Sequence, residues 1–123
     1  MSKIYLVDDQ PISNFITKKL LEIEGYEGFV KDFTNPIEAV EFVCEDQENA
    51  LIFLDLNMPE MNGWEFLERL QIHNSCHRII ILTSSTSQVD QQKAKDYPAV
   101  IKYMVKPMNK QKFSELSALL KAS

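Results

Sequence analysis

Short apolar runs alternate with segments of helical period along the whole chain. Five runs of strand length predict strands at residues 4–7, 29–33, 50–56, 79–83 and 100–106. Most of these runs are continuously apolar, which indicates a sheet that is buried on both faces. Because helical segments separate the runs, we expect right-handed crossovers and a parallel sheet covered by helices.

The segments between the strands carry apolar residues at spacings of three and four, which predicts amphipathic helices. The apolar face of the first helix consists of Ile12, Phe15, Ile16, Leu20 and Ile23. Asn35-Pro36 marks the start of the second helix, since asparagine favours the N-cap and proline the first helical position. The expected buried face of that helix consists of Ile37, Ala39, Val40 and Val43.

The last three helices differ in the apolar surface that they offer. In the third helix, which follows a turn at Asn62-Gly63, the expected inward residues are Trp64, Leu67 and Leu70. In the last helix, which Asn109 caps, they are Phe113, Leu116 and Leu120. The fourth helix follows a polar loop at residues 84–87 and offers only Val89, Ala94 and Tyr97. We therefore expect the fourth helix to be held least firmly by packing.

Length and composition limit the classes of protein to which this chain can belong. Its 123 residues suffice for one domain, which we place at residues 1–123. A net charge of −5, without a basic stripe, argues against direct binding of nucleic acid. The apolar runs are too short for a membrane span or a secretory signal. We therefore expect a cytoplasmic protein with no membrane association, in which Cys44 and Cys76 remain separate thiols.

Polar residues with related chemistry end four of the predicted strands. Asp8 and Asp9 follow the first strand, Asp55 the apolar part of the third, Thr83 ends the fourth and Lys106 ends the fifth. The carboxyl ends of parallel strands meet at one edge of a sheet, where such folds bind their ligands. We therefore predict that these residues converge on one site.

These residues suit the transfer of a phosphoryl group. Three carboxylates repel one another unless a cation is present, and Mg²⁺ prefers oxygen ligands and often binds carboxylates together with a phosphate. Lys106 can pair with a phosphate oxygen, and Thr83 can donate its hydroxyl to the same group. Asp55 is the best candidate for a nucleophile, because its strand is the most apolar.

The chain resembles the response-regulator receiver domains of two-component signalling. The matching features are Asp8-Asp9, Asp55 with Leu56-Asn57-Met58-Pro59 and Met61-Asn62-Gly63, Thr83, and Lys106-Pro107. The resemblance extends from Lys3 to about Leu120. It implies a flavodoxin-like (βα)5 fold, a doubly wound five-stranded parallel sheet with strand order 2-1-3-4-5.

The resemblance implies a phosphoacceptor and a magnesium site. Asp55 would accept a phosphoryl group from a sensor histidine kinase or a histidine phosphotransfer protein. Asp9 and Asp55 would bind Mg²⁺ directly, the backbone carbonyl of Asn57 would add an oxygen, and Asp8 would act through a bound water. The domain would catalyse only its own phosphorylation and dephosphorylation.

The resemblance also implies how the signal leaves the site. Thr83 and Lys106 would contact the phosphoryl group, and Tyr103 would be the switch residue that turns inward as Thr83 moves. The output surface would comprise the fourth helix, the fifth strand and the last helix. Tyr103 can equally be an ordinary strand tyrosine. Residues 91–98 depart from the alanine- and glycine-rich stretch of common receivers, which leaves the downstream partner open.

Three other interpretations compete with phosphorelay signalling. A hydrolase of the haloacid dehalogenase group would need an acid two residues after the nucleophile, where this chain has Asn57. A flavodoxin-like cofactor binder would need a hydroxyl- or glycine-rich loop after the first strand, in place of Asp8-Asp9-Gln10-Pro11. An unphosphorylated binding module of the same fold would not need intact acids or Lys106.

Two remaining features carry less weight. His73, Cys76 and His77 lie within five residues, which is a weak signal for a metal site, and we interpret this segment as an exposed connector. The chain ends a few residues after the last predicted helix, so we expect no effector domain and favour a free-standing regulator, while a phosphate shuttle and a fragment of a larger protein stay open as alternatives.

Overall fold

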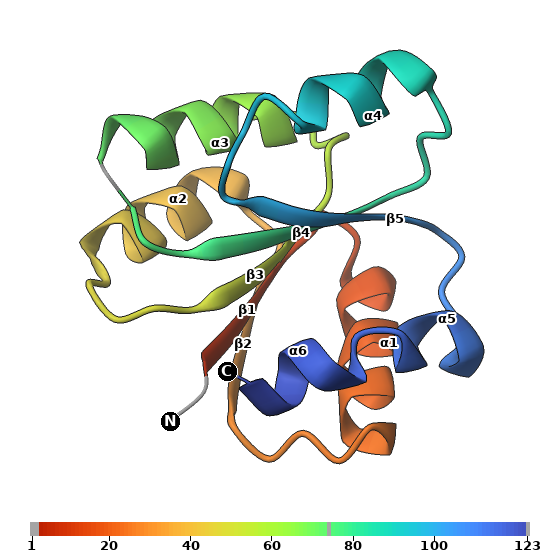
Figure 1. The fold of residues 1–123 in the computed structure, drawn as a ribbon. Helices are drawn as coiled ribbons and strands as arrows, with labels where there is room; N and C mark the ends of the chain where they lie inside the picture. Colours follow the sequence, from red (N-terminus) through yellow and green to blue (C-terminus); the bar gives the residue numbers. More distant parts are fainter. Residues whose placement is uncertain (1–2, 74, 123) are drawn as a thin grey trace.

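The computed structural model describes residues 3–73 and 75–122. Five parallel strands form one sheet in the order β2-β1-β3-β4-β5, which confirms the predicted topology (Figure 1). The strands are β1 (Lys3–Val7), β2 (Phe29–Phe33), β3 (Leu51–Leu54), β4 (Arg78–Thr83) and β5 (Val100–Val105). Only strand ends differ from the prediction, and β3 lies at the centre of the sheet.

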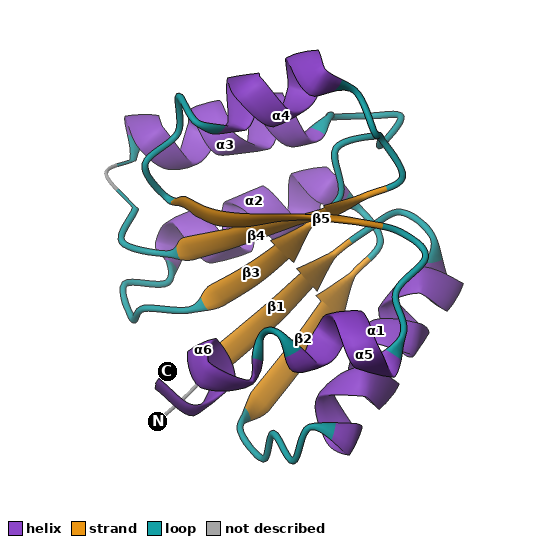
Figure 2. Ribbon diagram, turned by 45° about the vertical axis from the view of Figure 1, so that its right-hand side comes forward, coloured by secondary structure: helices purple, strands orange, loops and turns teal. Residues whose placement is uncertain are grey.

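Helices cover both faces of the sheet (Figure 2). They are α1 (Pro11–Ile23), α2 (Pro36–Glu45), α3 (Gly63–Ile72), α4 (Gln88–Ala94), α5 (Lys110–Ser114) and α6 (Ser117–Ala122). One core packs α2, α3 and α4 against one face, and a second core packs α1, α5 and α6 against the other. Alternate residues of β3 enter the two cores, which explains why its sequence is apolar throughout.

The apolar face expected of α1 is largely exposed. Leu20 is buried, but Ile12, Phe15, Ile16 and Ile23 are between 43% and 63% exposed. The buried residues of the helix are Asn14, Thr17, Leu20 and Leu21. The Asn14 side chain donates hydrogen bonds to the carbonyls of Asp8 (3.2 Å) and Phe33 (3.1 Å). These bonds tie α1 to the ends of β1 and β2 and turn an apolar stripe toward the surface.

The other expected helix faces need smaller corrections. In α2, Pro36, Ala39, Val40 and Val43 form the buried stripe. Ile37 lies off this stripe and is 39% exposed. In α4, Ala94 is buried as predicted, but Val89 lies five residues earlier, on another side of the helix, and is 75% exposed.

The predicted last helix is divided into α5 and α6. The N–H of Leu116 bonds to the carbonyl of Phe113, three residues back, at 2.9 Å. Bonds of this spacing tighten the turn and interrupt an α-helix. Phe113, Leu116 and Leu120 are nevertheless buried, as predicted.

Aromatic stacking fastens the segment after α4 to α3, although α4 itself has little apolar surface. The ring of Tyr97 stacks on Trp64 at a centroid distance of 5.7 Å, and the Tyr97 hydroxyl donates to Glu68 at 2.8 Å. Lys93 lies 4.8 Å above the Trp64 ring on the α4 side. Across the described ranges, no helix combines the length and apolar character that crossing a bilayer requires.

Candidate phosphoacceptor site

Backbone hydrogen bonds continue past three strand ends and fix the residues that follow. The Asp8 N–H bonds to the carbonyl of the last residue of β2 at 3.1 Å, and the Asp55 N–H bonds to that of β1 at 3.0 Å. The Lys106 N–H bonds to the last carbonyl of β4 at 2.8 Å. Three polar residues from distant parts of the sequence are thereby held at one edge of the sheet.

The predicted convergence of acids and lysine is present at this edge. Oxygen atoms of Asp8, Asp9 and Asp55 all lie within 4.8 Å of one another. Asp8 and Asp55 are buried and Asp9 is half-buried. The Lys106 Nζ lies 2.5 Å from Asp8 Oδ2 and 3.9 Å from Asp55 Oδ2, so the lysine bridges the two buried carboxylates.

The charge balance of this site favours a bound cation. Burial raises the pKa of the Asp55 carboxyl above its usual range, the Lys106 ammonium opposes that shift, and the Asp8 carboxylate adds to it. A second positive charge would stabilise the ionised carboxylates. Because every candidate donor is a carboxylate oxygen, the set fits Mg²⁺ better than a softer metal.

Of the other predicted residues, Asn57 contacts the acids through a described hydrogen bond, whereas Thr83 and Tyr103 bond to Ser85. Thr83 is fully buried, and its hydroxyl accepts a bond from the Ser85 N–H at 3.3 Å. The Asn57 N–H lies 3.4 Å from Asp55 Oδ1. The Tyr103 hydroxyl donates to the Ser85 carbonyl at 3.1 Å, so β5 is linked to the loop after β4. The roles of Asn57, Thr83 and Tyr103 stay predictions.

Gly63 supports the site in a way that its place in a turn did not indicate. Its N–H bonds to the Leu56 carbonyl at 2.9 Å. A Cβ at this position would lie 2.7 Å from the Asp55 carbonyl oxygen and 2.9 Å from the Leu56 Cα. The start of α3 thus packs directly on the backbone of the candidate phosphoacceptor, where only hydrogen fits.

Substituting Gly63 should therefore destabilise the fold. We expect Gly63→Ala to lower the free energy of unfolding by about 1–3 kcal/mol, the usual cost of overpacking, because the atoms in the way are backbone atoms. Urea unfolding followed by circular dichroism measures the change. Gln71→Ala, on the exposed side of α3, is the matched control and should stay within about 0.5 kcal/mol of wild type. Equal stability of Gly63→Ala and wild type would contradict the close packing.

The histidine- and cysteine-containing loop is partly buried, which corrects the expectation of an exposed connector. His77 is only 3% exposed. Its Nδ1 accepts a bond from the Ala50 N–H at 3.0 Å, and its Nε2 lies 2.8 Å from the Val43 carbonyl. Both ring nitrogens are thus occupied by backbone groups, so His77 is poorly placed to bind a metal. Cys44 and Cys76 are free thiols, as predicted.

The fold and the site together define a doubly wound α/β protein with an acidic edge beside a half-buried lysine. Comparison with known families adds the decisive finding, because the family described as response regulator receiver domain matches residues 4–118. The chain therefore belongs to the receiver domains of two-component response regulators. This assignment favours the receiver interpretation over the hydrolase and the cofactor binder.

Individual relatives agree with the family assignment. The chain is 32% identical to BvgA, a transcription regulator of virulence factors in Bordetella pertussis, over 67% of the chain and 38% of that protein. It is 32% identical to sporulation initiation phosphotransferase F of Bacillus subtilis, over 67% of the chain and 64% of that protein. The chain thus covers less than two thirds of either relative.

Solved structures agree with the fold. Chemotaxis protein CheY4 of Vibrio cholerae superposes with a TM-score of 0.78 at 28% identity, covering 98% of both chains. A two-component response regulator from Cytophaga hutchinsonii gives a TM-score of 0.83 at 23% identity, covering 100% of this chain and 98% of that one. Receiver domains are in general non-enzymatic signalling modules that bind Mg²⁺ in an acidic pocket, and response regulators interact with histidine kinases or phosphotransfer proteins.

Proposed function

We propose that this receiver domain accepts a phosphoryl group on Asp55 in a Mg²⁺-dependent reaction. A histidine kinase or a histidine phosphotransfer protein would be the donor. The observation that carries the proposal is the placement of Asp55, a buried carboxylate at the end of the central strand with Lys106 and two further acids beside it. The single-domain organisation and the cytoplasmic location also stay predictions.

Each side chain of the site has its own role in phosphoryl transfer. A carboxylate oxygen of Asp55 attacks phosphorus, and the bond from phosphorus to the donor nitrogen breaks with its electron pair remaining on the nitrogen, which then takes up a proton. Lys106, now held by Asp8, contacts an oxygen of the transferred group. Asp9 and Asp55 would hold Mg²⁺, with the Asn57 carbonyl and, through water, Asp8. The bound ion supplies positive charge that offsets the charge of the phosphoryl group.

The new phosphoryl group provides a physical route to a structural change. It adds about 1.5 to 2 negative charges and strong hydrogen-bond acceptors. Thr83 can donate its hydroxyl to these acceptors while still accepting the bond from the Ser85 N–H, so a shift of Thr83 toward the phosphoryl group would carry Ser85 with it. Tyr103 bonds to the same Ser85, so movement of this loop reaches β5 and alters the surface formed by α4, β5 and α5.

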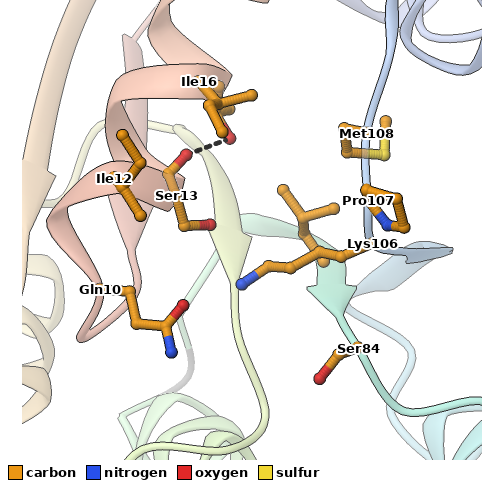
Figure 3. A pocket seen from close by; sticks show the side chains of 10 residues that line it. Gln10, Ile12, Ser13, Ile16, Ser84, Lys106, Pro107 and Met108 are labelled. Carbon is orange, nitrogen blue, oxygen red and sulfur yellow. Dashed lines mark hydrogen bonds between the residues drawn. The ribbon is translucent and has the colours of Figure 1, made fainter.

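The exposed face of α1 offers the donor a place to dock. Ile12 and Ile16 face Pro107 and Met108 across a pocket of about 320 Å³, and Lys106 extends into the same pocket (Figure 3). Apolar residues gathered on a surface commonly mark a protein contact. A donor that covers this patch would bring its phosphohistidine toward the edge of the sheet that holds Asp55.

Direct labelling tests the proposal. With phosphoramidate and Mg²⁺, the wild-type protein should gain the mass of one phosphoryl group, and peptide mapping should place it on the segment that contains Asp55. A protein that stays unlabelled, or that is labelled only at another segment, would refute the proposal. Continued release of phosphate over many turnovers would favour the hydrolase alternative instead.

A further inference from the structure

Lys112 holds the backbone on both sides of Lys106. This residue lies on α5, and its Nζ donates hydrogen bonds to the carbonyls of Val105 (3.2 Å) and Pro107 (3.1 Å). Val105 and Pro107 are the two chain neighbours of Lys106. One ammonium group therefore clamps the segment that presents the lysine of the site.

The clamp is itself anchored to a defined helix start. The Lys112 N–H donates to Asn109 Oδ1 at 2.8 Å, which is the N-cap bond of α5. Only residues 107–109 separate Lys106 from α5, and Pro107 has no N–H with which to stabilise this turn. An ammonium with three donors can bind both flanking carbonyls at once, which a neutral side chain of the same length cannot do.

The position of Lys106 connects the Lys112 clamp to the candidate phosphoacceptor site. Its Nζ reaches Asp8 at 2.5 Å and Asp55 at 3.9 Å, and its backbone directly follows β5, the edge strand of the sheet. A lysine side chain is long and flexible, so its reach into the site depends on where its own backbone is fixed. Groups that act on a reacting centre must be held within about 0.5 Å of their productive position.

We propose that Lys112 is a positioning residue for phosphoryl transfer, acting through Lys106. This inference rests on the proposed function, in which Lys106 contacts the phosphoryl group. Lys112 does not contact the acids; it sets the backbone from which Lys106 reaches them. Lys110, on the same helix, is exposed and serves as the matched control.

Rates of phosphorylation by phosphoramidate test the proposal without a protein donor. Lys112→Met keeps the length of the side chain and removes the donors. It should slow labelling by about threefold to tenfold, less than the roughly hundredfold cost of a 1 Å misplacement. Lys112→Arg keeps donors and should retain at least about half of the wild-type rate, whereas Lys110→Met should label at the wild-type rate. Lys112→Gln, which is too short to span both carbonyls, provides a second loss variant should Lys112→Met fold poorly.

A double-mutant cycle with Lys106→Ala separates positioning from general stability. If Lys112 acts through Lys106, Lys112→Met should cost less than about 1.5-fold once Lys106 is already alanine, because the two effects are coupled. The same loss in both backgrounds would overturn the proposal, as would a wild-type rate for both Lys112→Met and Lys112→Gln. An Arg variant that is as slow as the Met variant would also contradict it.

These outcomes are distinct from failure of the proposed function. If wild type itself takes up no phosphoryl group, the assignment of Asp55 is wrong and the positioning role has no reaction to serve. If wild type is labelled and removal of the Lys112 ammonium changes nothing, only the positioning role is wrong.

Discussion

Replacement of Asp55 by asparagine is expected to abolish phosphoryl transfer to this domain. The amide has nearly the shape of the carboxylate but lacks the nucleophilic, charged oxygen that would form the bond to phosphorus. At equal phosphoramidate and Mg²⁺ concentrations, intact-mass measurement should show one added phosphoryl group on wild type and none on Asp55→Asn. The expected effect is total, because Asp55 is the carboxylate that follows the central strand beside Lys106 and is the proposed acceptor.

A carboxylate elsewhere on the surface supplies the control for this experiment. Asp96 follows α4 and is exposed, so Asp96→Asn should be labelled like wild type. Equal labelling of Asp55→Asn and wild type would refute the assignment. Labelling that shifts to Asp8 in the Asp55 variant would show that the site is reactive but that its acceptor is not unique.

The same substitution should make the folded domain more stable. Burial raises the pKa of the Asp55 carboxyl in the folded protein, so the folded state binds a proton more tightly than the unfolded state does. Wild-type stability therefore falls as pH rises from the unfolded pKa through the raised folded pKa, and the loss persists at neutral pH. Without Mg²⁺, Asp55→Asn should gain about 1 kcal/mol in urea unfolding, a common trade between activity and stability.

The positions of the acids and of Lys106 could be predicted because they depend on strand ends. A continuous apolar run shows where a buried strand stops, and parallel topology brings the carboxyl ends of such strands to one edge. Asp8, Asp55 and Lys106 follow directly from these two facts, and backbone hydrogen bonds beyond the strands keep them in place. The particular magnesium ligands, by contrast, were implied by the resemblance to receiver domains and stay a prediction.

Features that depend on single side-chain contacts could not be predicted. The spacing of apolar residues in α1 suggested an inward face, but two hydrogen bonds from Asn14 to backbone carbonyls rotate that face outward. In the sequence, Gly63 cannot be distinguished from an ordinary turn glycine; only the structure shows how closely it approaches the Asp55 backbone. Lys112 is one lysine among several near the C-terminus, and only the carbonyls that it binds distinguish it. The periodicity of apolar residues predicts which side chains are buried. The roles of Asn14, Gly63 and Lys112 arise instead from contacts between residues distant in sequence or from turn geometry.

Removal of Mg²⁺ is the second change expected to have a large effect. Three carboxylates lie within 4.8 Å of one another, and the nearby Lys106 is engaged mainly by Asp8. Without a further cation, a phosphate donor would meet net negative charge at the site. Chelation should therefore lower the labelling rate by about a hundredfold, comparable with the loss of one preorganised charge-stabilising group in an enzyme. Restoring Mg²⁺ in excess should restore the rate.

The dependence on Mg²⁺ concentration identifies the residues that hold the ion. Asp9 is half-buried, and among the described contacts Lys106 pairs with Asp8 and Asp55 rather than with Asp9, so the Asp9 carboxylate is available for a cation. Asp9→Asn should raise the Mg²⁺ concentration needed for half-maximal rate by about tenfold or more, because it removes a charged oxygen ligand. Asp96→Asn should leave that concentration unchanged. A rate that is insensitive to the chelator would remove the metal from the mechanism. A normal Mg²⁺ requirement in Asp9→Asn would instead leave Asp8 and Asp55 as the carboxylates that carry it.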